Sequence, residues 1–386
     1  MKILLIGGTG VLSSAVTTEA LKQGMTVTVI NRGNRPHLIP AGVELIKADK
    51  EDHNLIKEAI CHTFFDAVVD FLCYTEKEVA KSYSFYSAYT KQYFFISSCA
   101  VFDARKQGLL QEDSPKVLDG WTYSIHKWAA EQRLMACAAR SGTNYTIVRP
   151  GITYGDTRIP YGVGPRYGYH WTWIARILND KPILRWNKGE TRWNMMRVED
   201  FAVGMVGLIG NDKAYNEAFN LCGDNSHSFN EVLDIVADWT NHPVKIVDVS
   251  SEFYAREVPL KRGEICGYSV NFECSNEKIK KIVPAFKQSI SLHEGIFRTL
   301  EAYKYQNYQR GIDWEFDAET DRVIHKWCKK EGEIVPYSLH FVDYLQTASF
   351  KNKLTYYVSY YQDNFFVKLF LQGIRILKKA GRILKL

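Results

Sequence analysis

The N-terminal strand and the glycine turn after it constrain the fold more than any other segment of the chain. Ile3–Ile6 is an apolar run typical of a strand buried in a parallel sheet, and Val11–Lys22 has the pattern of a helix. Between them, Gly7 and Gly10 allow a tight turn in which a pyrophosphate can reach the helix N-terminus. Ser13 replaces the usual third glycine but is small enough for close packing. A tight turn without a ligand is the alternative. We predict a dinucleotide site contacted by Gly7, Thr9, Gly10, Val11 and Leu12.

Further strand patterns follow along the first 150 residues. We expect strands near residues 2–6, 26–30, 43–47, 67–70, 93–97 and 145–149, with helices between them. This alternation predicts an α/β fold built on a Rossmann-type doubly wound parallel sheet.

The end of the second strand bears on the choice of dinucleotide. Folds that bind NAD usually carry an acidic residue there, which holds the ribose diol. This chain has Asn31 and Arg32 instead, and a guanidinium suits a 2′-phosphate. We therefore predict NADP in preference to NAD, although Arg32 could also stack on adenine or be an ordinary surface residue. Asp49 follows the third strand, where it would lie near the adenine or cap the next helix.

Tyr123 and Lys127 are spaced by four residues, so on a helix they share one face. An ammonium beside a phenol stabilises the phenolate and lowers its pKa. The pair could therefore move a proton on or off a hydroxyl while a nicotinamide takes or gives a hydride. A solvated helix face is the alternative for an isolated pair.

Taken together, these motifs resemble those of the extended short-chain dehydrogenases/reductases. The glycine turn, Ser97-Ser98, the Tyr123–Lys127 pair and Arg149-Pro150 are similar to the epimerase/dehydratase branch, which acts on nucleotide-sugars. Asn-Arg-Gly at 31–33 and Val-Asp-Phe at 69–71 resemble a subgroup that also contains chloroplast stem-loop-binding proteins.

The resemblance implies roles for individual residues. Ser98 would bind the reacting oxygen of the substrate, Tyr123 would be the general acid or base, and Lys127 would hold the nicotinamide ribose. The further residues implied are Phe71, Pro150 and Ile152 at the cofactor and, among the arginines Arg158, Arg166, Arg192 and Arg197, chiefly Arg192 and then Arg197 at the substrate diphosphate. Cys99 and Ala100 replace the Asp-Glu pair of sugar dehydratases, which makes dehydration the wrong reaction for this chain.

The resemblance also implies a domain plan and a function. We expect a Rossmann domain at 1–155 with a return segment at 198–222, a smaller substrate domain at 156–310, and a helical extension at 311–386. The expected function is epimerisation of a nucleotide-sugar at C4, with an NADPH-dependent keto-sugar reductase as the alternative. A dinucleotide-binding, RNA-associated or regulatory protein is the alternative from another class. We expect a homodimer and no nucleic-acid partner.

Composition excludes several other classes. The eight cysteines form no C-x-x-C motif and do not cluster with the ten histidines, so we predict reduced thiols and no metal site. The first strand begins at Lys2 without a leader, and no apolar run reaches membrane-spanning length. These observations predict a cytoplasmic enzyme.

The last 36 residues differ from the rest of the chain. They contain eight basic residues, Asp363 as the single acid, and interleaved Phe, Leu and Ile. This composition is typical of a basic amphipathic helix on an anionic membrane, which would place the protein at its inner face. The alternative is that the apolar face packs on this protein or on a second subunit. The tail supplies much of the net charge of +6, so that charge is poor support for nucleic-acid binding.

Overall fold

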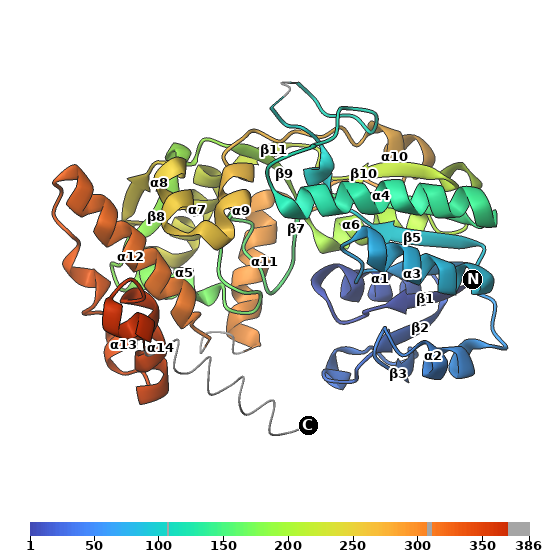
Figure 1. The fold of residues 1–386 in the computed structure, drawn as a ribbon, viewed down its shortest axis with the longest axis horizontal. Coiled ribbons are helices and arrows are strands. Elements are labelled where there is room, and N and C mark those ends of the chain that lie inside the picture. Colours follow the sequence, from blue (N-terminus) through green and yellow to red (C-terminus); the bar gives the residue numbers. More distant parts are fainter. Residues whose placement is uncertain (106–107, 307–310, 370–386) are drawn as a thin grey trace.

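In the computed structural model, which describes residues 1–105, 108–306 and 311–369, the chain forms two domains that lie side by side (Figure 1). The first domain is a parallel seven-stranded sheet with the order β10-β6-β5-β4-β1-β2-β3. Its strands are β1 (Lys2–Ile6), β2 (Thr26–Asn31), β3 (Glu44–Lys47), β4 (Ala67–Asp70), β5 (Gln92–Ile96), β6 (Asn144–Pro150) and β10 (Glu217–Leu221). The predicted Rossmann-type fold is confirmed, and the predicted strand ends differ from the observed ones by about one residue.

Helices cover both faces of this sheet, which explains why its strands read as continuous apolar runs. The helices are α1 (Val11–Lys22), α2 (His53–Ile60), α3 (Glu76–Tyr86), α4 (Thr122–Ser141), α6 (Val198–Gly207) and α10 (Glu277–Ile282). Side chains from α1, α6 and α10 pack with Leu5 and Val29 on one face. Side chains from α2, α3 and α4 pack with Leu4 and Ile6 on the other. The chain thus returns to the first domain twice, and the sequence had predicted only the return that provides α6 and β10.

The second domain combines two small sheets with an aromatic core. Its strands are β7 (Ile152–Tyr154), β8 (Ile183–Trp186), β9 (Arg192–Arg197), β11 (Ser226–Ser228) and β12 (Ile246–Val249), in the orders β11-β9-β7 and β12-β8. Its helices are α5 (Trp171–Leu178), α7 (Phe229–Thr240), α8 (Ser251–Glu257), α9 (Arg262–Gly267) and α11 (Leu292–Tyr305). Tyr161 packs edge-on against Trp173 and Trp186 at its centre.

The C-terminal helices continue the second domain. They are α12 (Trp314–Glu331), α13 (Asp343–Gln346) and α14 (Phe350–Tyr360). Phe316, Val323 and Ile324 of α12 belong to the same hydrophobic core as α5, β8 and α7. Helix α12 therefore packs into the core of the second domain, while Val342, Leu345, Tyr356 and Tyr360 form a smaller core with Ala318 of α12.

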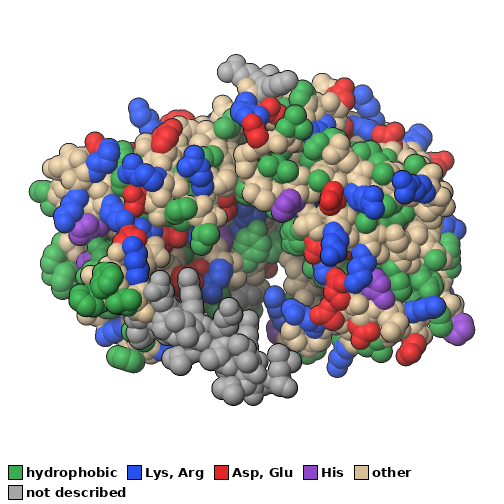
Figure 2. Space-filling model, in the orientation of Figure 1, with side chains coloured by type: hydrophobic (Ala, Val, Ile, Leu, Met, Phe, Trp, Pro, Cys, Tyr) green, Lys and Arg blue, Asp and Glu red, His purple; other side chains and the backbone are tan. Residues whose placement is uncertain are grey.

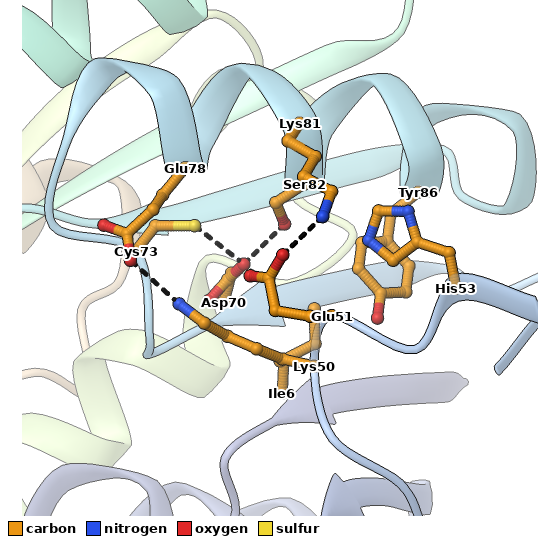
Figure 3. Close-up of a pocket in the computed structure, with 10 residues that line it drawn as sticks. All are labelled: Ile6, Lys50, Glu51, His53, Asp70, Cys73, Glu78, Lys81, Ser82 and Tyr86. Atoms are coloured by element: carbon orange, nitrogen blue, oxygen red, sulfur yellow. Dashed lines mark hydrogen bonds and ion pairs between the residues drawn. The ribbon is translucent and has the colours of Figure 1, made fainter. Parts of the chain in front are cut away.

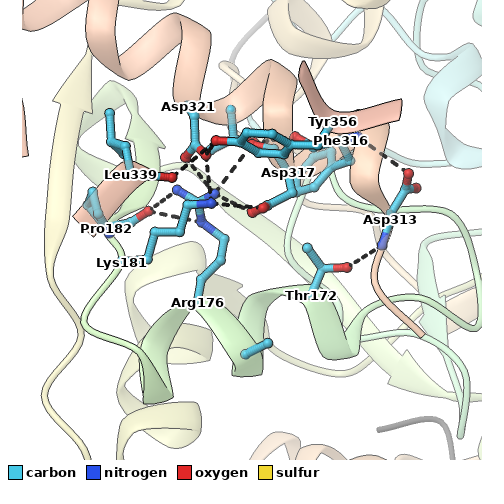
Figure 4. Close-up of polar contacts among 12 residues, drawn as sticks. Thr172, Arg176, Lys181, Pro182, Asp313, Phe316, Asp317, Asp321, Leu339 and Tyr356 are labelled. Atoms are coloured by element: carbon cyan, nitrogen blue, oxygen red, sulfur yellow. Dashed lines mark hydrogen bonds and ion pairs between the residues drawn. The ribbon is translucent and has the colours of Figure 1, made fainter. Parts of the chain in front are cut away.

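A buried cluster of four charges fastens α12 to the α5–β8 connection (Figure 4). Arg176 pairs with Asp317 and Asp321 at 2.5 and 2.8 Å, and Lys181 pairs with the same two carboxylates at 2.8 and 2.6 Å. All four side chains have no exposed surface. Although burial opposes the shift, Lys181 and Arg176 lower the pKa of Asp317. The balanced charges make this burial tolerable, since each ion retains a counter-ion.

Helix α14 is bound to α12 through the same cluster. Tyr356 is fully buried, and its hydroxyl donates to Asp321 Oδ2 at 2.5 Å and to the carbonyl oxygen of Leu339 at 3.1 Å. For this face of α14, the contacts agree with the alternative prediction that the tail packs on its own protein. The basic residues from Arg375 to Lys385 lie outside the described residues. In the part of the chain that the structure does describe, no helix is long and apolar enough to span a membrane.

Candidate active site

The glycine turn between β1 and α1 is shaped by backbone packing. Gly7 has a φ of +105°, and a Cβ on Gly8 would lie 2.5 Å from Val29 Cγ1, so neither position accommodates a side chain. Ser13 Oγ accepts from the Gly10 amide at 2.9 Å and donates to the Gly7 carbonyl at 3.0 Å. The serine that replaces the third glycine therefore closes the turn with two hydrogen bonds. Gly8 was not singled out from the sequence, although its packing constraint is as strict as that of Gly7.

The surroundings of this turn fit a dinucleotide. The first turn of α1 contains no acidic residue, and Thr9, Val11 and Leu12 are half-buried beside it. Asn31 Oδ1 accepts from the Gly33 amide at 2.7 Å, which leaves its Nδ2 buried without a hydrogen-bond partner among the described residues. A buried donor of this kind needs an acceptor. A ribose or phosphate oxygen would supply one at the end of β2.

Arg32 and Asp49, the other residues predicted for the adenine end, are both exposed. Arg32 makes no ion pair within the described part of the chain. Asp49 Oδ1 accepts from the Glu51 amide at 3.0 Å. Asp52, rather than Asp49, caps α2 by accepting from the Leu55 amide, so the alternative role of Asp49 as a helix cap is wrong.

The side chains around a small hollow beside the end of β4 hold the loop that leads to α3 (Figure 3). Asp70 is 2 % exposed, and its carboxylate accepts from the Leu72 amide, the Cys73 thiol and the Ser82 hydroxyl. Lys50 Nζ donates to the carbonyl oxygen of Leu72 at 2.9 Å and to Glu78 at 3.1 Å. These contacts hold residues 71–74, including the half-buried Phe71 predicted for the cofactor, at the edge of the sheet.

Ser98, Tyr123 and Lys127 come together at the carboxyl end of β5. The Ser98 hydroxyl lies beside the Tyr123 phenol and acts to lower its pKa. Lys127 lies one turn further along α4, and its Nζ donates to the carbonyl oxygens of Cys73 and Ile96 at 2.7 and 2.8 Å. Ser97 points away, since its hydroxyl donates to the buried Glu131 at 2.5 Å. Ser98 is therefore the serine that shares a site with Tyr123.

Burial dominates the protonation of both titratable groups. It raises the pKa of the Tyr123 phenol above its usual value, and the neighbouring Ser98 hydroxyl opposes this shift. Burial also lowers the pKa of Lys127 from 10.5 to about 8. The expected lowering of the phenol pKa by Lys127 is thus not found, because Lys127 donates to two carbonyls and lies 5.9 Å from the centre of the Tyr123 ring.

Aromatic side chains surround Tyr123 on the side that faces the second domain. Trp121 lies 5.2 Å from its ring, and Tyr268 lies 5.8 Å from Trp121. Burial raises the pKa of Tyr268, and the half-buried Arg158 opposes this shift; the Arg158 guanidinium carbon lies 5.2 Å over the Tyr167 ring. The molecule is hollowed between its two domains (Figure 2). Chemically, these residues offer a proton donor or acceptor, flat apolar faces and a cation.

The sequence has relatives of known function. The model of the "NAD dependent epimerase/dehydratase family" matches residues 3–222, which is more than half of the chain. The chain belongs to this family. It is therefore an enzyme of a nicotinamide-dependent class, as the motifs had predicted.

Individual relatives are distant but cover most of the chain. A 2′-dehydrokanamycin reductase of Streptomyces kanamyceticus is 22% identical over 67% of this chain and 72% of its own length. The chloroplast stem-loop binding protein of 41 kDa b of Arabidopsis thaliana is 25% identical over 84% of both chains. Among solved structures, a UDP-glucuronic acid 4-epimerase of Bacillus cereus, in complex with UDP-glucuronic acid and NAD, has a TM-score of 0.61 at 17% identity. It covers 79% of this chain and 100% of its own, and at this identity it shows the fold alone.

Arg192 and Arg197, which were predicted to bind a substrate diphosphate, form ion pairs with carboxylates of this chain. Arg192 pairs with Glu231 at 3.0 Å and donates to Ser226 of β11. Arg197 has a side chain that is 3 % exposed and pairs with Asp156 at 2.9 Å and with Glu199. A substrate phosphate would have to compete with these carboxylates. Arg158 differs, since it makes no ion pair with any carboxylate in the described ranges.

Pro150 and Ile152 lie at the crossing from the first domain to the second. Pro150 ends β6 and is buried, while Ile152 begins β7, is 3 % exposed and packs in the core of the second domain. Cys99, which also packs in that core, donates its thiol proton to the carbonyl oxygen of Arg149 at 3.2 Å. Neither Cys99 nor Ala100 can replace the acidic pair of a dehydratase.

Several residues around Tyr123 were not found from the sequence. Tyr74 lies 6.4 Å from the Tyr123 ring, and its own ring lies 4.4 Å from Lys127 Nζ. Trp121 and Tyr268 belong to this group as well. The position of Tyr74 just after β4 was the available signal, because the carboxyl ends of parallel strands carry the ligand site in open α/β sheets.

Proposed function

We propose that this enzyme oxidises and re-reduces a sugar hydroxyl of a nucleotide-sugar, with 4-epimerisation as its reaction. The observation that carries the proposal is the placement of the Ser98 hydroxyl beside the Tyr123 phenol, whose pKa it lowers, one helical turn from the buried Lys127. A protein that only bound a dinucleotide would have no use for this arrangement. The stem-loop-binding relative therefore supports the fold and the dinucleotide site more than it supports a role in RNA binding.

A bound nicotinamide dinucleotide would supply the hydride chemistry. The glycine turn, Asn31 and Lys127 are the groups we assign to holding it. Tyr123 would take the proton from the sugar hydroxyl as the carbonyl forms and return it when the hydroxyl is restored. The Ser98 hydroxyl would donate a hydrogen bond to that sugar oxygen and so orient it. The raised pKa keeps the Tyr123 phenol protonated, so its proton is in place for the reducing half of the cycle, while the oxidising half requires the phenolate.

The residues beyond Tyr123 support a nucleotide-sugar as the substrate. Arg158 offers a guanidinium that makes no ion pair within the described part of the chain, which suits a phosphate or carboxylate oxygen. Trp121, Tyr167 and Tyr268 offer faces for a sugar or a base. The UDP-glucuronic acid complex of the Bacillus cereus neighbour agrees with this class of ligand.

A one-way keto-sugar reductase that uses NADPH is the second candidate. The exposed Arg32 and the missing acid at the end of β2 favour a 2′-phosphate, and one relative is a reductase. We propose NADP as the cofactor on the same ground. Calorimetry with NADPH and NADH should show that Arg32→Ala weakens NADPH binding more. Equal losses for both would assign the site to NAD.

The decisive experiment incubates the purified enzyme with UDP-glucose and UDP-glucuronic acid and follows the sugar by proton NMR. An epimerase converts either compound into its C4 epimer without net consumption of dinucleotide. A reductase leaves both compounds unchanged but oxidises NADPH in step with a keto-sugar. If neither reaction occurs and Tyr123→Phe has no effect with any nucleotide-sugar tested, the assignment to sugar chemistry fails.

A further inference from the structure

Helix α14 has a second apolar face in addition to the face that packs on α12. Phe350, Leu354, Tyr357 and Tyr361 recur at the spacing of one helix face. Their exposed fractions are 81, 44, 36 and 49 %. The buried residues Tyr356 and Tyr360 lie on a different side, toward α12. The exposed side of a helix that packs on a core usually carries polar residues, whereas this exposed side of α14 carries apolar and aromatic ones.

The row continues beyond the end of α14. Phe365, Phe366 and Leu369 are 68, 77 and 49 % exposed. We call these three residues, together with Phe350, Leu354 and Tyr357 of α14 and Tyr361 at its end, the aromatic stripe. In Figure 2, hydrophobic side chains gather at the lower left of the molecule, where Figure 1 places α13 and α14. Contiguous exposed apolar surface of this kind marks an interaction site more often than single exposed residues do.

The charges beside the stripe are positive. Lys351, Lys353 and Lys368 lie on or beside it, and Asp363 is neutralised by ion pairs with Arg322 and Lys326. The sequence that follows the stripe, residues 370–386, adds five basic residues and no acidic one. Aromatic side chains interleaved with lysine and arginine match an anionic lipid surface, which accepts rings at its headgroup level and attracts cations.

We propose that the aromatic stripe docks this enzyme on an anionic membrane surface, with the rings at the headgroup level and the lysines facing lipid phosphates. A second copy of the chain is a poorer occupant. In a two-fold interface the same patch meets itself, so the basic residues of the two copies would oppose each other. The proposal does not depend on the reaction assigned to Tyr123, because the stripe is on the C-terminal helices and not among the catalytic residues.

Vesicle sedimentation tests the proposal with the full chain. Vesicles of phosphatidylcholine with about one third phosphatidylserine should bind the enzyme at low salt and release it at high salt. Phe365→Ser combined with Phe366→Ser should weaken binding about tenfold or more, because two exposed rings lose their apolar contact. Phe64→Ser is the matched control, since Phe64 is 56 % exposed but follows α2 in the first domain, and it should bind like the wild type.

A truncation that ends at residue 369 removes the five basic residues and leaves Tyr356 in place. The truncated protein should bind anionic vesicles more weakly than the wild type, since each basic group near an anionic surface raises the affinity about fivefold. Wild-type protein that ignores anionic vesicles at low salt would overturn the proposal. So would light scattering that shows a dimer in the wild type and a monomer in the Phe365/Phe366 variant, because the stripe would then be an interface between copies.

Discussion

Replacing Arg158 tests the proposed substrate site more directly than replacing any other arginine. Its guanidinium donates to the carbonyl oxygen of Thr153 at 3.3 Å and lies over the ring of Tyr167. Arg158 makes no ion pair within the described residues. Burial raises the pKa of Glu264, and both Lys261 and Arg158 oppose this shift, so Glu264 keeps Lys261 beside it in Arg158→Ala. The effect on substrate binding can therefore be separated from an effect on folding.

The expected magnitude follows from the contact that would be lost. A hydrogen bond to a charged group contributes about 1.5–3 kcal/mol, and every 1.4 kcal/mol corresponds to about a tenfold change in affinity. Arg158→Ala should accordingly raise KM for a nucleotide-sugar about 10- to 150-fold. Loss of the contact with Tyr167 should lower the free energy of unfolding by only about 0.5–1 kcal/mol.

The matched control is Arg192→Ala. Arg192 has a 42 % exposed side chain and pairs with Glu231, so its removal should cost about 0–1 kcal/mol in stability and leave KM within about threefold. Steady-state kinetics and urea unfolding of both variants provide the measurements. The reasoning is refuted if KM is unchanged in Arg158→Ala, or if Arg192→Ala raises KM by as much.

Three other outcomes follow from the structure. Tyr123→Phe should lower kcat about 10²–10⁴-fold while calorimetry still detects dinucleotide binding; turnover within about threefold of wild type would remove Tyr123 from the mechanism. Asp321→Asn should lower the free energy of unfolding by about 3–5 kcal/mol, whereas Asp248→Asn, which breaks a pair whose carboxylate is 47 % exposed, should cost less than about 1 kcal/mol; similar losses would mean that the buried cluster adds little. Because the pKa of Lys127 is lowered to about 8, the unfolded chain binds more protons between pH 8 and about 10.5, so stability should rise with pH in that window by about 3 kcal/mol from this group. Lys127→Met should abolish that rise in urea unfolding, and an unchanged slope would contradict the shift.

The strands, and the placement of Tyr123 and Lys127 on one helix, could be predicted because their signals are local. A strand covered on both faces leaves a continuous apolar run, and each run in the first domain marked one strand. The spacing of Tyr123 and Lys127 is likewise a property of a single helix, α4. Ser98 could be separated from Ser97 only through the family pattern. In the structure, the two serines differ because the Ser97 hydroxyl donates a hydrogen bond to Glu131 of α4.

Properties that depend on distant partners could not be predicted in this way. Whether an arginine is available to a ligand depends on which carboxylates lie beside it. Arg197 meets Asp156, which is 41 residues away in the sequence, and Arg192 meets Glu231, which is 39 residues away. The constraint on Gly8 comes from Val29 on the next strand. The pKa of Tyr123 could not be foreseen for the same reason, since burial raises it and Tyr74, Tyr268 and Tyr167, all distant in sequence, add to that shift.

The buried cluster of Arg176, Lys181, Asp317 and Asp321 also limits how this chain could have changed over time. Half of the cluster comes from the α5–β8 connection and half from α12, so neither half is stable in the interior without the other. Relatives that lack the C-terminal helices should have uncharged residues where this chain has Arg176 and Lys181. Relatives that keep the helices should retain all four charges or lose them together, so substitutions at these positions should covary across an alignment.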